Sequence, residues 1–112
     1  MAIGLRNQVK SVPISVSSIG DNTIVAAVAG KLITVVALLL VNGVGTAQSV
    51  TVKDGASNLL SGAMPLNTAG DPLFLDEKTD FDYFSTSAAA NNLILNLSAA
   101  TLVAGVVWYI QN

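Results

Sequence analysis

The side chains that could carry out chemistry in this 112-residue chain are few, because the sequence contains neither histidine nor cysteine. The usual general base and the thiolate nucleophile are therefore missing. Acyl transfer would need a serine beside a lysine, and Ser49 and Lys53 offer that combination. Both lie in the alternating segment QSVTVKD, which indicates the solvated face of a β-strand. We therefore predict that the protein is not an enzyme.

Carboxylates gather in residues 71–82, which hold five of the seven acidic residues. Such carboxylates can serve glycoside hydrolysis or bind Ca²⁺. The spacing in DEKTDFD lacks the glycine of an EF-hand loop, and acidic clusters in one loop are more often solvated. We predict no catalytic, cofactor or metal site, and leave calcium or glycan binding by this acidic segment as open alternatives.

Two further motifs suggest ligands, and both have simpler interpretations. The glycines of NGVGT (42–46) resemble a phosphate loop, but no Gly-Lys-Ser/Thr follows and no helix begins, so we expect a hairpin turn instead. Trp108 and Tyr109 could form the sugar-stacking platform of a lectin-like module. Because neighbouring residues of a strand point to opposite faces, at most one belongs to a given surface. We predict packing in a core or an interface.

Composition narrows the possible partners. Hydrophobic residues make up 52% of the chain and charged residues 11%, against about 25% charged in an ordinary soluble domain. The net charge is −2 and no basic cluster is present, so we predict no nucleic-acid partner. A monomer with a neutral surface is one interpretation of these values. We favour a subunit whose faces are covered by neighbouring copies.

The longest apolar run, residues 34–41, is too short to cross a membrane, which requires about 20 apolar residues. Pro13 also interrupts the region where the core of a secretory signal would lie. We expect a soluble, unprocessed chain with no membrane partner. The lack of cysteine fits an intracellular origin and other compartments equally.

The elements that position these residues are predicted to be strands. Segments 11–17, 49–53 and 92–97 alternate apolar and polar residues, and Pro13 places the first of them at a sheet edge. A short strand is expected at 73–75, and Gly105 marks a bulge or a close approach in the last strand. About eight strands give an all-β, single-domain antiparallel β-sandwich (jelly-roll-like) over residues 11–112, after an N-terminal arm at 1–10.

Segments 32–41 and 102–110 are apolar at both odd and even positions, so both faces of each strand need shelter. We expect the two strands to lie side by side and to present their outward faces to a second subunit. The alternative is that a long loop such as 67–82 folds over the outer face. The residues predicted at an oligomer or capsid interface are Arg6, Lys10, Ile33, Val35, Leu39, Val41, Val107, Trp108 and Tyr109.

Four segments, NTIVAAVAGKLITVVALLLV, SVTVKDG, MPL and NNLILNLSAATLVAGVVWYIQ, together resemble in order and spacing a family of small all-β virion proteins of tailed bacteriophages. The family includes head decoration (cement) proteins. The resemblance spans roughly residues 12–111, and it rests on strand patterns and turns without a catalytic signature.

This resemblance implies a jelly-roll subunit that forms a homotrimer on the outer surface of an icosahedral capsid. The protein would be made in the host cytoplasm and would bind the major capsid protein where capsomers meet, with Arg6 and Lys10 helping an arm to engage the shell. A tail or head-fibre component is the second prediction. A carbohydrate-binding module is the alternative from another class.

Overall fold

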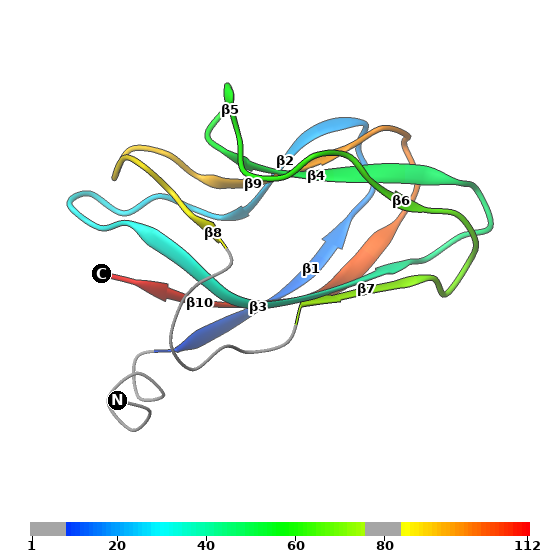
Figure 1. The fold of residues 1–112 in the computed structure, drawn as a ribbon, viewed down its shortest axis with the longest axis horizontal. Coiled ribbons are helices and arrows are strands. Elements are labelled where there is room, and N and C mark those ends of the chain that lie inside the picture. Colours follow the sequence, from blue (N-terminus) through cyan, green and yellow to red (C-terminus); the bar gives the residue numbers. More distant parts are fainter. Residues whose placement is uncertain (1–8, 76–83) are drawn as a thin grey trace.

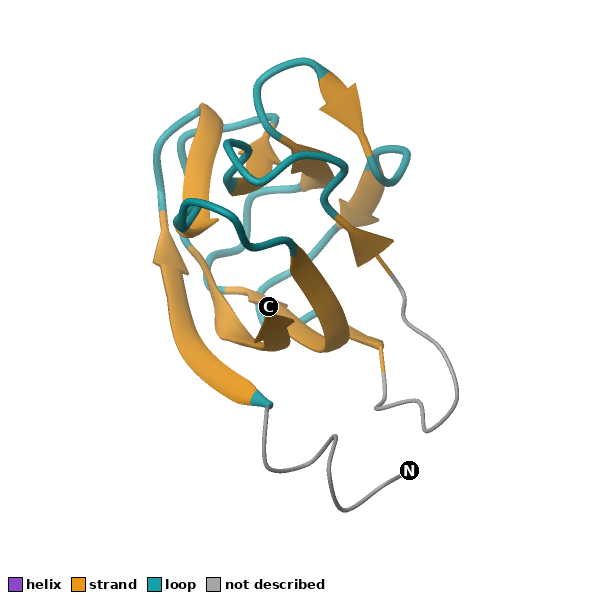
Figure 2. Ribbon diagram, turned by 90° about the vertical axis from the view of Figure 1, so that its left-hand side faces the viewer, coloured by secondary structure: helices purple, strands orange, loops and turns teal. Residues whose placement is uncertain are grey.

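The computed structural model describes residues 9–75 and 84–112 and folds them into two packed antiparallel sheets (Figure 1). Strands and loops make up the whole of this described part (Figure 2). The strands are β1 (Lys10–Val16), β2 (Gly20–Val25), β3 (Ile33–Asn42), β4 (Gln48–Asp54), β5 (Asn58–Leu59), β6 (Met64–Leu66), β7 (Pro72–Leu75), β8 (Phe84–Ser85), β9 (Leu93–Leu97) and β10 (Val103–Gln111). The predicted all-β sandwich is confirmed.

The pairing of the strands is nested: the first strand pairs with the last, the second with the last but one, and so on toward the middle of the chain. Sheet A has the order β1-β10-β3-β7, and sheet B has the order β2-β9-β4-β5. The short strands β8 and β6 add to β3 and β4. Pairs β1·β10 and β3·β7 fall in one sheet, and β2·β9 and β4·β6 fall in the other. This alternation of nested pairs between two sheets is the arrangement of a jelly roll.

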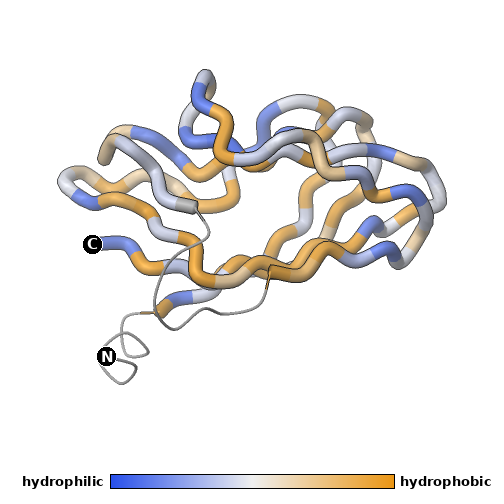
Figure 3. Tube along the Cα trace, viewed as in Figure 1, coloured by the Kyte–Doolittle hydropathy of each residue, from blue (hydrophilic) through white to orange (hydrophobic). Residues whose placement is uncertain are grey.

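The core lies between the sheets and follows the alternation of the strands. On β4 the inward positions are buried and the outward ones half-buried, as period two requires. Val12, Ile14 and Val16 of β1 turn inward, and the strand lies at the edge of sheet A, as Pro13 predicts. Apolar residues are most continuous along the central strands of sheet A, the lower layer in Figure 3.

A β-bulge explains part of the apolar pattern of β3. Trp108 pairs with Ala37 and Tyr109 pairs with Val35, which leaves Val36 as an extra residue on β3. The inward side therefore changes parity along the strand: Ile33 and Val35 point into the core, followed by residues 38 and 40. Apolar residues at both odd and even positions of β3 therefore pack into the same core.

The segment 42–46 does not form the predicted hairpin. Strand β3 lies in sheet A and β4 lies in sheet B, so this connection crosses from one sheet to the other. Asn42 is fully buried, and its Nδ2 donates hydrogen bonds to the carbonyl oxygens of Thr46 and Leu66, both at 3.1 Å. The glycines at 43 and 45 do not adopt positive φ. The buried side chain of Asn42 therefore holds this connection in place through its hydrogen bonds.

The predicted adjacency of the two long apolar strands is confirmed, because β10 pairs with β3 over most of its length. Gly105 lies at their closest approach: a Cβ there would be 1.9 Å from the carbonyl oxygen of Leu39. The bulge itself occurs at Trp108/Tyr109 and not at Gly105. Close approach is therefore the role of this glycine.

Candidate interaction surface

The pairing register shows which side chains of sheet A point away from the core. Val106 pairs with Pro13 on β1 and with Leu39 on β3, and Leu39 in turn pairs with Phe74 on β7. Residues paired directly across strands share a face, and their neighbours along each strand belong to the core cluster. We call the apolar part of this outward surface the apolar face; its members are Pro13, Ala37, Leu39, Val41, Pro72, Phe74, Ala104, Val106 and Trp108. Ser11 and Ser15 of β1, which pair with Trp108 and Ala104, lie on the same side of the sheet at its edge.

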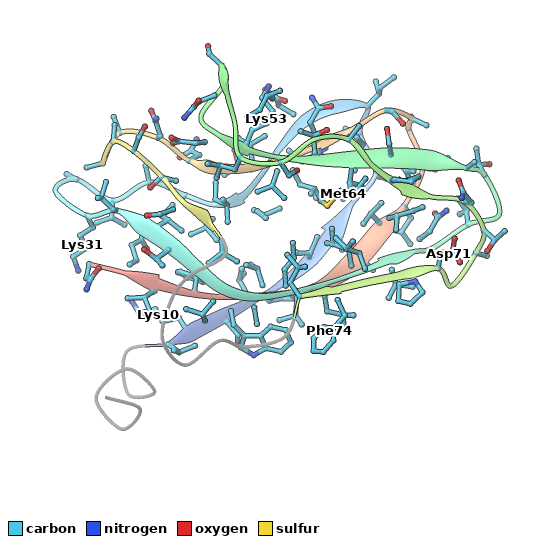
Figure 4. All side chains as sticks on the ribbon, viewed as in Figure 1. Lys10, Lys31, Lys53, Met64, Asp71 and Phe74 are labelled. Atoms are coloured by element: carbon cyan, nitrogen blue, oxygen red, sulfur yellow. The ribbon has the colours of Figure 1, made fainter. Side chains whose placement is uncertain are left out.

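Five of these side chains are half-buried and Ala37 is buried, whereas Pro13, Pro72 and Phe74 are exposed, with Phe74 at 56%. In Figure 4 Phe74 projects below sheet A, on the side away from sheet B, and Lys53 lies at the opposite side of the sandwich. The sequence prediction missed Phe74 as a surface residue. Its place in the short strand at 73–75, next to inward-packing Leu73 and Leu75, was the available signal.

The structure divides the predicted interface residues into two groups. Ile33, Val35 and Val107 are at most 1% exposed and belong to the core, so their assignment to an interface is wrong. The bulge is the reason for the first two, because it turns them inward. Tyr109 packs against the core as well.

The other group lies on the outer surface. Leu39, Val41 and Trp108 belong to the apolar face, and their role in an interface stays a prediction. The expectation that Trp108 and Tyr109 point to opposite faces is confirmed.

Several sequence predictions concern segments at the margin of sheet A. Lys10 is exposed at the start of β1, while Arg6 and most of the predicted arm lie outside the described residues. Of the loop expected to cover the outer face, residues 72–75 form β7, which extends the sheet beside β3. Residues 76–82, with most of the acidic cluster, lie outside the described part of the chain.

The outer face of sheet B is chemically different. Lys53 Nζ donates to both carboxylate oxygens of Asp21, at 2.9 and 3.0 Å, and Asn96 Nδ2 donates to the same carboxylate at 2.7 Å. The hydrogen bond from Asn96, followed by that from Lys53, lowers the pKa of Asp21. Because the ammonium of Lys53 is held by a carboxylate, it is not poised to activate Ser49 as a nucleophile.

A buried carboxylate lies at the end of β4. Asp54 is 1% exposed, and its Oδ2 accepts hydrogen bonds from Asn58 Nδ2, Ser87 Oγ and the Ser87 amide, at 2.7 to 2.9 Å. Asn91 Nδ2 donates to Oδ1 at 2.8 Å. Burial raises the pKa of Asp54, but the hydrogen bonds led by Ser87 outweigh it and leave the pKa lowered. This cluster ties the β4–β5 hairpin to the segment before β9.

Among residues 9–75 and 84–112, no three His, Cys, Asp or Glu side chains gather closely enough to hold a metal ion. Nor does any helix there have the length and hydrophobicity needed to cross a membrane.

Comparison with known proteins gives no further guide. No protein-family model matches the chain, and no curated protein matches it.

Proposed function

We propose that the protein is a virion structural subunit, a decoration (cement) protein that assembles with copies of itself on the outer face of an icosahedral phage head and stabilises the junctions between capsomers. The observation that supports this proposal best is the contrast between the two outer surfaces of the sandwich. One is the apolar face, and the other carries the Lys53–Asp21 ion pair and amide groups. Such a subunit has one side suited to burial and another suited to water.

The low charge of the chain supports the same proposal. With 11% charged residues, most of the surface can be desolvated without stripping water from ions. A subunit repeated over a lattice contacts several neighbours at once, and weak contacts then combine into stable attachment. Stabilisation of the shell would follow from this multiplicity, because each decoration subunit joins capsomers that would otherwise separate under outward pressure.

A tail or head-fibre component would use the same kind of surface, and the location of the protein in the virion distinguishes the two. A carbohydrate-binding role has one observation in its favour, since Phe74 and Trp108 share the apolar face. A sugar site also needs polar groups that fix the orientation of the ligand. The side chains that define the apolar face provide few of them, so we rank this role lower.

Co-sedimentation tests the proposal. Purified protein is mixed with expanded, undecorated heads of the phage that carries its coding sequence, with unexpanded heads and heads of an unrelated phage as controls. We expect saturable binding to the expanded heads at a fixed ratio to capsomers. Protein that stays in the supernatant with every preparation, yet binds to a glycan array, would replace the decoration role with the carbohydrate-binding one.

A further inference from the structure

We infer that the apolar face is covered by the same face of a second copy, so that two sandwiches pack with sheet A against sheet A. This inference rests on the proposed function, because it names the partner that this face meets in the assembly. A two-fold axis near the Leu39–Val106 pair, at the middle of the β3–β10 ladder, would give both copies identical contacts.

The first support is the charge of the face. The charged side chains in the described part of the chain, Lys10, Asp21, Lys31, Lys53, Asp54 and Asp71, all lie outside the nine positions of the apolar face. A surface that meets itself brings identical residues close to one another, and like charges there would repel. The nine positions bring no such repulsion.

The second support is the lack of another matching surface among the described residues. The outer face of sheet B carries the ion pair of Lys53 and Asp21, and covering it with apolar side chains would desolvate both charges. The remaining large exposed apolar residues, Ile19, Val28, Leu32 and Leu59, are in loops or in the two-residue strand β5. Within residues 9–75 and 84–112, only the apolar face itself offers a sheet-sized apolar partner.

The size of the face sets the expected affinity. Four strands about 4.8 Å apart, with about five residues each at a rise of about 3.3 Å, give on the order of 400 Å² per copy once side-chain width is included. The two copies together would bury about 800 Å², roughly half of a standard interface. The pair is therefore expected to dissociate in the micromolar range and to be strengthened when neighbours are held on a lattice.

This pairing differs from the homotrimer that the sequence resemblance implies. Contacts between identical faces close after two copies, whereas a three-fold ring joins two different surfaces of each subunit. The number of copies in solution therefore separates the two arrangements.

The test is analytical ultracentrifugation of the full chain and two lysine variants at about 1 to 500 µM, a range chosen to bracket weak interfaces. Val106→Lys places a charge on the apolar face, and Thr51→Lys is the matched control on the outer face of sheet B, also half-buried. We expect dimers for the parent chain and for the control, and dissociation at least about 100-fold weaker for Val106→Lys, because a desolvated charge has no partner. Thermal unfolding verifies that each variant is folded.

A second measurement does not depend on a disruptive charge. Since the chain has no cysteine, Leu39→Cys and Thr51→Cys each create a single thiol. A short bismaleimide should join two copies of Leu39→Cys and should leave Thr51→Cys as single chains.

A parent chain that is monomeric throughout, or trimeric, would overturn the inference, as would equal crosslinking of the two cysteine variants. A dimer that does not bind phage heads would support the inference and contradict the proposed function. A trimer that binds heads would support the proposed function and contradict the inference.

Discussion

Asp54 is a buried carboxylate that forms no ion pair within the described part of the chain and accepts four hydrogen bonds from Asn58, Ser87 and Asn91. Hydrogen bonds to a charged acceptor are stronger than those between neutral groups, and a buried charge persists only when it is satisfied in this way. The donors come from a hairpin and from a segment more than thirty residues away in sequence. Asp54 therefore acts as a cross-link within the sandwich.

Replacing Asp54 by alanine should lower the free energy of unfolding by about 3 kcal/mol, because several buried donors lose their acceptor. Asp54→Asn should lower the free energy of unfolding by part of this amount, and the size of the reduction should depend on pH. The lowered folded pKa means that the carboxylate contributes stability above the unfolded value near 3.8, and loses it as pH falls through the folded pKa.

Urea unfolding of the parent chain and Asp54→Asn between pH 2 and pH 7 measures this dependence. The stability difference between them should be largest near neutral pH and should shrink in acid. A difference that stays constant across the range would show that ionisation of Asp54 does not stabilise the fold.

Single residues also show how far the sequence could be interpreted. The inward position of Asp54 follows from its parity with Val50 and Val52, so its burial was predictable, although its donors were not. The orientation of Ile33 and Val35 was not predictable, because nothing in the local sequence marks the bulge at Val36. One extra residue in the strand exchanges the inward and outward orientations of all side chains on its N-terminal side.

The β3–β10 ladder is the central element of sheet A and depends on a glycine. Gly105 pairs with Leu40 on one side and Ile14 on the other, so its backbone is enclosed by two strands. The carbonyl oxygen of Leu39 occupies the space that a side chain would need. Because backbone atoms cannot move aside as a flexible side chain does, a substitution must deform the ladder.

Gly105→Ala should therefore destabilise the protein by about 1–3 kcal/mol or more, as overpacking does. Gly45→Ala is a suitable control, because a Cβ added there would have no atom within 4 Å and the φ of Gly45 is ordinary. Denaturant unfolding monitored by circular dichroism compares the two variants. Equal stabilities for both would contradict the close approach between β10 and β3.

The strands were more predictable than their connections. Alternation located β1 and β4, since each has one face in the core and one outside. It also located β9, although Ile94 on the outward side of that strand is buried. The turn residues Asn42 and Gly43 predicted the end of β3 correctly. The predicted hairpin between β3 and the next strand was wrong, because β4 lies in the other sheet. Turn residues report a change of direction, whereas the choice between pairing and crossing to the other sheet depends on contacts distant in sequence.

The complete sandwich combines two surfaces of opposite character, and its proposed role follows from that asymmetry. The sequence indicated an excess of apolar residues, and the structure places much of the part that does not enter the core on the outer side of sheet A. The identity of the covering partner could not be predicted, because composition reports how much surface needs burial and not what buries it.

Trp108 is the single tryptophan of the chain and a member of the apolar face, so its fluorescence reports directly on whether that face is covered. The decisive measurement is acrylamide quenching of this fluorescence during dilution from about 500 to 1 µM, the range expected for a weak interface. Quenching should increase several-fold, with a shift of the emission to longer wavelength, as the covered face becomes exposed to water. Quenching that is unchanged across this range, in a chain whose mass is that of a monomer, would contradict the claim that the apolar face is an assembly surface.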